Sequence, residues 1–171
     1  MHTNLPHFSQ KSQYQFITFR TKDSTDDFIK KQLEDKKLQT KLIQYNIDKY
    51  LDKSTKGAYL NSEIINIVKK YLLSVDKNLC EVLALSIMPN HIHIILVQND
   101  DLSKIIQYIK GGLSFLINKK LGKSGPLWQK DYFDKVVRDE KHFEVIYEYV
   151  KNNAQKAALS DAKERFYSIY E

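Results

Sequence analysis

The spacing of hydrophobic and polar positions divides the first half of the chain into a strand and two helical regions. Residues 13–21 are rich in aromatic and β-branched side chains, a composition that favours a strand. Residues 24–52 carry apolar positions at helical spacing, and we expect a helix there, with room for one break, capped by Ser24 or Thr25. Residues 62–75 repeat this spacing and predict a second helix with one buried stripe.

The middle of the chain predicts a hairpin followed by a long helix. Residues 81–88 and 91–98 both have strand composition, and the intervening Pro89-Asn90 turn predicts that they pair as an antiparallel hairpin. Residues 102–121 follow as a helix, interrupted by Gly111-Gly112 at a cost of about 1 kcal/mol per Gly relative to Ala. Such a pair marks either a close approach of another segment or a local break.

The last third adds an extended segment and a final helix. Residues 127–137 are extended and aromatic, and Asp139 is placed to cap a helix from residue 140 to about 159. This order of elements predicts an α+β sandwich, with helices on one face of a mainly antiparallel sheet. Because no linker or repeat interrupts the pattern, we expect residues 1–171 to form a single domain.

Composition narrows the class of protein. With 42% hydrophobic and 28% charged residues, the chain has the content of a folded globular domain rather than a disordered one. A mean hydropathy of −0.49 and the lack of an apolar run near 18 residues exclude a predicted membrane span. No secretory signal is visible at the N-terminus, and Cys80 is the only cysteine. We therefore expect a cytoplasmic protein, associated with the nucleoid if it binds DNA, and no membrane partner.

The formal net charge of +6 is concentrated in one stretch of the sequence. Residues 102–138 contain eight Lys or Arg and two Asp, a net of +6, so the remainder of the chain is balanced. One interpretation is a solvated helix face with a basic loop. The other is a surface that follows the phosphates of a nucleic acid.

His91 and His93 form the first candidate site. Strand alternation places both imidazoles on one face, whereas Ile92, Ile94 and Leu96 form a core face on the other. Their Cα atoms would lie roughly 6–7 Å apart, close enough to ligate one divalent ion. Two protein ligands are too few for a closed structural site, so an ion held there would be open to substrate. The alternative is a pair of packing or surface histidines.

The last helix carries the second candidate site. At about 100° per residue, Tyr149 falls on the flank of the apolar stripe, with Asn153 and Lys156 along the same flank. One interpretation is an amphipathic helix with a polar flank. The other is a tyrosine nucleophile, with the amide as a metal ligand or phosphate donor. The apolar stripe itself contains Phe143, Ile146, Tyr147, Val150, Ala154 and Ala157.

Two segments carry a family resemblance. Residues 88–97, Met-Pro-Asn-His-Ile-His-Ile-Ile-Leu-Val, resemble the HUH motif of single-tyrosine transposases. Residues 127–140, followed by Tyr-Val-Lys-Asn-Asn at 149–153, resemble the second half of the REP-associated tyrosine transposases. The resemblance implies a ferredoxin-like (RRM-like) fold and a Mg²⁺ or Mn²⁺ ion. It also implies cleavage and rejoining of single-stranded DNA through a 5′-phosphotyrosine intermediate.

By position, this resemblance assigns His91 and His93 to the metal, Tyr149 to the nucleophile, and Asn153 to the polar residue one helical turn later. The chain departs from the family at residues 153–158, where Asn-Ala and Lys-Ala-Ala replace the usual Asn-Pro and Lys/Arg-Ala-Gly. Without that Pro and Gly the helix can run on, which would shift Asn153. Residues 24–77 match no part of the family pattern.

The DNA contacts that we expect follow from the basic stretch and the flank of the last helix. The expected phosphate contacts are Lys110, Lys130, Arg138 and Lys156, and Trp128 is either a stacking surface for an extruded base or a core residue. The expected partner is single-stranded or hairpin DNA. A homodimer, in which the tyrosine helix serves the other subunit, stays open.

Three function classes remain at this point. The leading one is a metal-dependent, single-stranded DNA transposase that acts through Tyr149. The alternative is a non-catalytic module that binds hairpin DNA or RNA on the same fold. A metal hydrolase that uses water is the least favoured, because no carboxylate lies beside the histidine pair in the sequence.

Overall fold

A computed structural model of the protein describes residues 12–35, 37 and 39–171. Its centre is a five-stranded sheet with the order β4-β1-β3-β2-β5, in which all neighbouring strands are antiparallel. The strands are β1 (Gln13–Arg20), β2 (Cys80–Ile87), β3 (His91–Gln98), β4 (Phe133–Val136) and β5 (Phe166–Ser168). The predicted hairpin of β2 and β3 is confirmed, as is the α+β class with a mainly antiparallel sheet.

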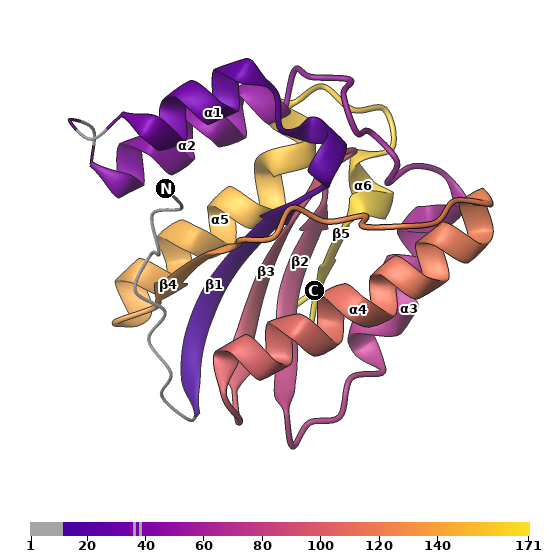
Figure 1. The fold of residues 1–171 in the computed structure, drawn as a ribbon. Coiled ribbons are helices and arrows are strands. Elements are labelled where there is room, and N and C mark those ends of the chain that lie inside the picture. The colour runs from indigo at the N-terminus through magenta and orange to yellow at the C-terminus, as the bar shows by residue number, and fades with distance from the viewer. Residues whose placement is uncertain (1–11, 36, 38) are drawn as a thin grey trace.

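Helices pack on both faces of the sheet and above one end of it (Figure 1). They are α1 (Asp27–Glu34), α2 (Thr40–Leu51), α3 (Glu63–Leu73), α4 (Leu102–Leu121), α5 (Glu140–Lys156) and α6 (Ala162–Arg165), with a 3₁₀ turn η1 (Lys22–Ser24) after β1. α3 and α4 lie side by side on one face, and α5 covers the other (Figure 1). The prediction of helices on one face describes α3 and α4, and the C-terminal helix provides the second layer.

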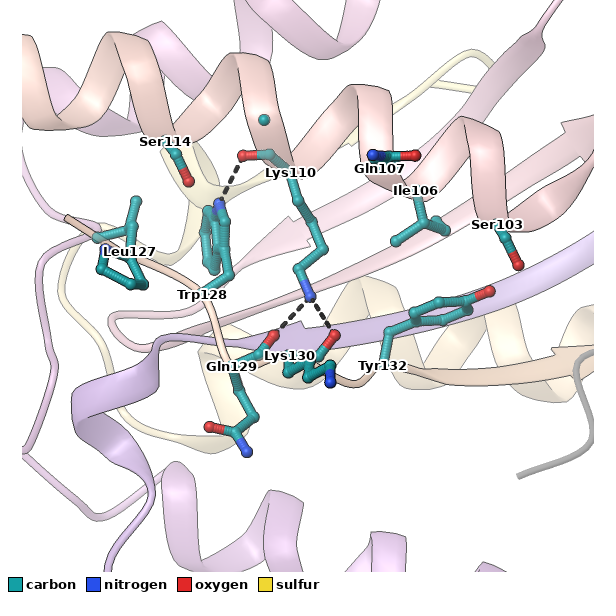
Figure 2. A pocket seen from close by; sticks show the side chains of 12 residues that line it. Ser103, Ile106, Gln107, Lys110, Ser114, Leu127, Trp128, Gln129, Lys130 and Tyr132 are labelled. Atoms are coloured by element: carbon teal, nitrogen blue, oxygen red, sulfur yellow. Dashed lines mark hydrogen bonds between the residues drawn. The ribbon is translucent and has the colours of Figure 1, made fainter. Parts of the chain in front are cut away.

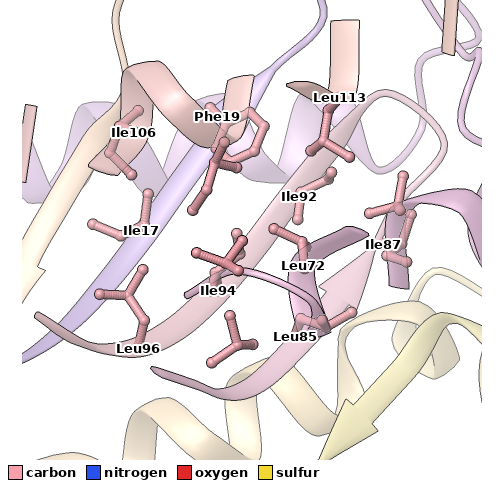
Figure 3. Packing of buried hydrophobic residues seen from close by; sticks show 14 of the residues in the cluster. Ile17, Phe19, Leu72, Leu85, Ile87, Ile92, Ile94, Leu96, Ile106 and Leu113 are labelled. Carbon is pink, nitrogen blue, oxygen red and sulfur yellow. The ribbon is translucent and has the colours of Figure 1, made fainter. Parts of the chain in front are cut away.

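The main core lies between the sheet and the α3–α4 pair. Strand alternation sends Ile17 and Phe19 of β1, and Ile92 and Ile94 of β3, into this layer, where they are all buried. Leu72 of α3 and side chains of α4 pack against them (Figure 3). The predicted core face of the histidine strand is therefore confirmed.

A smaller core lies on the opposite face, beneath α5. Phe16 and Ile95 of the sheet contact Ile146 and Val150 of α5 in this layer. His91 and His93 project from the same face of β3 as Ile95. The second layer therefore combines apolar packing at one end with polar side chains at the other.

The segment predicted as a broken helix forms two helices, α1 and α2, joined by a turn. Ile29 of α1 packs against Ile47 and Leu51 of α2 in a cluster of its own. The expected caps were wrong, because Asp26 accepts hydrogen bonds from the backbone N–H groups of Phe28 and Ile29. Ser24 instead lies in η1, where its hydroxyl donates to the carbonyl of Thr21.

The last helix ends three residues earlier than predicted. α5 stops at Lys156, and Ala158 adopts a positive φ of 56°. This left-handed conformation after a helix is usually adopted by glycine. The N–H of Leu159 then bonds the carbonyl of Ala154, which satisfies one of the terminal acceptors. The expectation that the helix runs on without a Gly was wrong, and Asn153 keeps its helical position.

The two adjacent glycines of α4 behave differently. The helix is continuous through both, so no local break occurs there. A Cβ on Gly112 would overlap the hydroxyl of Tyr71 of α3, whereas nothing lies within 4 Å of a Cβ on Gly111. The Tyr71 hydroxyl also donates a hydrogen bond to the carbonyl of Tyr108 at 3.0 Å. Gly112 is therefore required for the close approach of α3 to α4.

This difference predicts opposite effects of two matched substitutions. Gly111→Ala should raise the free energy of unfolding by about 0.5–1 kcal/mol, since Ala favours the helix and meets no neighbour. The free energy of unfolding of Gly112→Ala should be about 1–3 kcal/mol lower than that of Gly111→Ala. The added Cβ forces the Tyr71 side chain to move and to lose its hydrogen bond to Tyr108. Urea unfolding followed by circular dichroism measures both values. Equal stability of the two variants would contradict the assigned contact.

Candidate active site

The β-hairpin holds His91 in a defined orientation and tautomer. The Nδ2 of Asn90 donates to the carbonyls of Leu51 and Ser54, at 3.1 and 3.2 Å, so its Oδ1 is left to face His91. His91 Nδ1 lies 2.7 Å from that oxygen and is therefore the protonated ring nitrogen. Its Nε2 consequently carries a lone pair, the form in which imidazole binds a metal.

His93 is fixed by the neighbouring strand. Its Nδ1 lies 2.7 Å from the hydroxyl of Thr18, its register partner on β1, and its ring stacks on Phe16. Burial lowers the pKa of His93 to about 3, and burial, with the nearby His93 and Arg20, lowers the pKa of His91 well below 6.5. Both imidazoles are therefore neutral at physiological pH and available as ligands.

Tyr149 of α5 faces the histidines of its own chain. Its ring centroid lies 5.3 Å from that of His93, in an edge-on contact. The hydroxyl donates a hydrogen bond to Oδ2 of Asp48 at 3.0 Å. Burial and the carboxylates of Asp48 and Asp52 raise the pKa of Tyr149 above its usual value of 10. The phenol is thus protonated at rest, with an acceptor in place for its proton.

Helix α2 contributes two carboxylates to the same site. Asp48 is buried and also accepts a hydrogen bond from Gln44 Nε2 at 2.8 Å. Oδ1 of Asp52 lies 3.6 Å from Nε2 of His91. Burial raises the pKa of Asp48 to about 7, with a contribution from Asp52, and burial raises the pKa of Asp52 to about 6. Each carboxylate is therefore held in a setting that penalises its negative charge.

Several polar atoms of this site have no hydrogen-bond partner among the described residues. They are Nε2 of His91, Nε2 of His93, Oδ1 of Asp52 and Oδ1 of Asn153. Such groups cost about 1–3 kcal/mol each when they stay unsatisfied. All four can present a lone pair, and a divalent cation is the partner that lone pairs of imidazole, amide and carboxylate share.

The donor atoms also have the spacing that a metal ion needs. Ligand atoms of Asp48, His91 and His93 all lie within 4.8 Å of one another. Ligand distances of about 2.0–2.2 Å to one ion require donor atoms separated by at most about 4.4 Å after a small adjustment. The residues present therefore fit a divalent ion bound by two imidazoles and a carboxylate.

The structure thus brings together four of the residues expected to form the site. The ring of His93 makes edge-on contacts with the rings of both His91 and Tyr149. Asn153 follows Tyr149 by one helical turn, and its side chain is buried. Lys156 lies at the C-terminal end of α5 and is exposed.

Trp128 is a core residue, contrary to the stacking interpretation. Its side chain is 6% exposed, meets Phe19 edge-on at 4.8 Å, and donates its indole N–H to the carbonyl of Lys110. Its ring is therefore almost fully buried, and its polar atom has a partner within the protein. Of the two interpretations of Trp128, this packing favours the core residue.

Lys110 acts as an internal clamp. Its ammonium donates to the carbonyls of Gln129 and Lys130, at 2.5 and 3.2 Å, and so ties α4 to the segment after Trp128 (Figure 2). Burial lowers the pKa of Lys110 to about 8. Lys110, Gln129 and Lys130 line a cavity of about 400 Å³ on the α4 side of the sheet, away from the histidines. Lys110 is therefore poorly placed to follow DNA phosphates.

Some of the remaining basic residues have partners within the protein, and others are exposed. Within the basic stretch, Lys104 pairs with Asp100 at 2.7 Å and Lys123 lies 3.6 Å above the ring of Tyr59. Lys130 and Arg138 are exposed. Arg138 precedes α5 and Lys156 ends it, so these two lie roughly 25 Å apart along the helix axis. Of the four lysines and arginines expected to contact DNA, Lys130, Arg138 and Lys156 remain candidates.

Asp48 is the residue of the candidate site that the sequence interpretation missed. Gln44, Asp48 and Asp52 are spaced by four residues, so they form one polar strip beside the apolar stripe of Ile47 and Leu51. This is the same pattern that singled out Tyr149 and Asn153 on α5. The strip could have been found, but its proximity to the histidines depends on how α2 packs above the sheet.

Comparison with known proteins identifies the family. Residues 45–153 match the IS200-like transposases, and the chain belongs to this family. The resemblance based on the two motifs is therefore confirmed. The match includes residues 45–77, so the expectation that residues 24–77 share nothing with the family was wrong for that part. None of the curated proteins compared with the chain matches it.

Two solved structures are similar to this one. A REP-associated tyrosine transposase bound to a REP hairpin has a TM-score of 0.56 at 16% identity, covering 90% of this chain and 73% of its own. A candidate transposase from Deinococcus radiodurans has a TM-score of 0.49 at 15% identity, covering 88% and 98%. The first of these shows a shared fold. Within the described residues, no helix has the length and apolar character needed to cross a membrane.

The buried carboxyl of Asp48 predicts a pH dependence of stability without metal. Its folded pKa of about 7 lies above the unfolded value near 3.9, so between these pH values the folded state holds a proton that the unfolded state releases. Its contribution to stability is therefore present below pH 4 and is lost as the pH rises through 7, by up to about 4 kcal/mol.

The measurement is urea unfolding of the wild type and Asp48→Asn in EDTA from pH 4 to 8. The stability of the wild type relative to the variant should fall with rising pH over this range. The histidines, whose lowered pKa values act in the opposite direction below pH 6.5, are common to both proteins and cancel in the difference. A pH-independent difference would show that Asp48 is ionised throughout.

Proposed function

We propose that this protein is a metal-dependent transposase that cleaves and rejoins single-stranded DNA through Tyr149. The observation that carries the proposal is the meeting of three groups: a phenol, a pair of neutral imidazoles, and a carboxylate that accepts the phenol's hydrogen bond. The family is that of transposases, and the similar structure that shares its fold is described as bound to a REP hairpin. Single-stranded or hairpin DNA is therefore the proposed substrate.

His91, His93 and Asp48 would hold the divalent ion, with Asn153 Oδ1 as a further ligand. Mg²⁺ or Mn²⁺ suits this mixture of nitrogen and oxygen donors. When bound there, the ion would withdraw charge from the oxygens of the scissile phosphate. Asn90 would keep His91 in the ligating tautomer, and Thr18 would keep the His93 ring in position.

In the proposed reaction, the phenolic oxygen of Tyr149 attacks the scissile phosphorus. The new O–P bond forms as the bond from phosphorus to the 3′-oxygen breaks, which leaves a 5′-phosphotyrosine and a 3′-oxyanion that takes a proton from solvent to become the free 3′-hydroxyl. Asp48 is placed to receive the phenolic proton, since it already accepts the hydrogen bond. Attack of a 3′-hydroxyl on the phosphotyrosine reverses these steps and rejoins DNA without ATP.

All the groups named in this proposal come from one chain, so catalysis in a monomer is the simplest form of the proposal. Tyr149 faces the histidine pair of its own chain. Asp48 accepts the hydrogen bond of Tyr149 and lies close to both histidines. A homodimer is compatible with this arrangement but supplies none of the groups named here.

The nucleophile assignment predicts the loss of a covalent product. Wild-type protein incubated with labelled hairpin DNA and Mn²⁺ should form a DNA–protein adduct that survives a denaturing gel. Tyr149→Phe and His91→Ala should abolish it. Tyr147→Phe is the matched control, because its hydroxyl bonds Ser168 and Glu171 away from the site and its loss should leave the adduct intact.

Other outcomes of this assay separate the function classes. An adduct that persists in Tyr149→Phe would refute the assignment of the nucleophile. Cleavage with a free 5′-phosphate and no adduct would indicate a hydrolase. The sequence disfavours this class because no carboxylate lies beside the histidine pair, but Asp48 lies close to the pair in the fold. Tight DNA binding without any cleavage would indicate the non-catalytic module.

The ligand assignment predicts a change in metal affinity. Asp48→Asn should weaken Mn²⁺ binding at least about tenfold, because a charged oxygen donor becomes a neutral one. Isothermal titration of the DNA-free protein measures this, with His91→Ala as a positive control. Glu81→Gln, on the surface where it pairs with Lys77, should bind as the wild type does. Unchanged affinity in Asp48→Asn would remove Asp48 from the ligand set.

A further inference from the structure

Arg20 lies beside the candidate metal ligands and has no part in the proposal so far. It is the last residue of β1, and the register pairs it directly with His91, as Thr18 pairs with His93. Cross-strand partners have Cβ atoms about 5 Å apart and project from the same face of the sheet. The guanidinium therefore belongs to the polar end of the second layer, next to the two imidazoles.

The hydrogen bonds of Arg20 leave most of its donors available. Its Nε donates to the hydroxyl of Thr25 at 3.3 Å, and that hydroxyl donates in turn to Oε1 of Gln129 at 3.4 Å. Among the described residues, this is the only hydrogen bond that the Arg20 side chain makes. The two terminal nitrogens of the fork thus have no partner in this part of the chain, although the arm that carries them is anchored.

The charges around Arg20 make an anion the matching ligand. Burial lowers the pKa of Arg20, while Asp48 and Asp131 oppose that shift from a distance without forming an ion pair with it. An arginine remains charged in such a setting, so its positive charge is only partly compensated. Its remaining charge and its unoccupied N–H donors therefore match an anionic ligand such as a phosphodiester group.

We propose that Arg20, oriented by Thr25, binds a phosphodiester of the DNA strand that crosses the candidate active site. The planar fork offers two parallel N–H donors to two phosphate oxygens, a geometry that a lysine does not provide. This places the contacted phosphate between β1 and the histidine pair, next to Tyr149. The inference rests on the proposed function, since it assumes that the site receives single-stranded DNA.

The test is a binding measurement that does not require catalysis. In a Tyr149→Phe background and in EDTA, fluorescence anisotropy reports the Kd for a labelled oligothymidylate of about 20 nucleotides at several salt concentrations. Arg20→Gln should weaken binding about tenfold and reduce the slope of log K against log salt by about 0.7, the value for one phosphate contact to a single strand. Lys77→Gln removes an exposed charge at the opposite end of the sheet and should change neither value.

A second pair of variants separates phosphate binding from charge balance within the protein. If Arg20 served only to offset Asp48, the double variant Arg20→Gln with Asp48→Asn would recover wild-type affinity, and this would overturn the proposal. If Arg20 binds phosphate, the double variant stays weak. Arg20→Lys keeps the positive charge but lacks the planar fork. It should therefore retain the salt slope of the parent protein and bind the oligonucleotide less tightly. This variant provides the test if Arg20→Gln fails to fold.

The two proposals fail in distinguishable ways. Equal Kd and salt slope for Arg20→Gln and its parent would refute the phosphate contact, whatever the chemistry of Tyr149. The opposite outcome is that Arg20→Gln weakens binding as expected while the protein that retains Tyr149 forms no covalent adduct. That result would refute Tyr149 as the nucleophile and would support the phosphate contact of Arg20.

Discussion

The register of the central strand β3 is the constraint on which the rest of the molecule depends. β3 is paired on both sides, so its alternation is fixed by β1 and β2 at once. Ile92 and Ile94 enter the α3–α4 core, and His91 and His93 necessarily face the other layer. A slip by one residue would place two imidazoles in the core and two isoleucines at the site. The same hydrophobic packing that stabilises the fold therefore orients the candidate metal ligands.

That orientation has an energetic cost which explains the electrostatics of the site. Burial keeps both histidines neutral, raises the pKa values of Asp48 and Asp52, and leaves several lone pairs without donors. In a well-packed domain such groups are normally satisfied. Their concentration at one place, on three different elements, is what distinguishes this end of the sheet from an ordinary polar surface. A bound cation would relieve these penalties together, and metal binding would then stabilise the fold.

Most of the fold, and the residues at its centre, could be predicted from local patterns. The period-2 alternation identified the faces of β3, and the 3.6-residue period placed Tyr149 off the apolar stripe of α5. Asp48 and Arg20 were not found, because their importance depends on contacts between α2, β1 and β3 that are distant in the sequence. The same limit applies to Trp128, whose aromatic character suited both a core and a binding surface until its packing against Phe19 decided between them.

The distribution of charge shows why a segment's net charge was a poor guide to the DNA surface. The stretch from 102 to 138 carries the whole excess of the chain, yet Lys110 is bound to backbone carbonyls and Lys104 is paired with Asp100. A lysine with an internal partner contributes little to an external field near it, since the opposite charge or dipole lies within a few ångströms. Arg20, by contrast, lies in a segment of unremarkable charge and pairs with no carboxylate among the residues that the structure describes. The strength of a cation's interaction with a phosphate depends on which of its donors the fold leaves unoccupied, and that is a property of the tertiary structure.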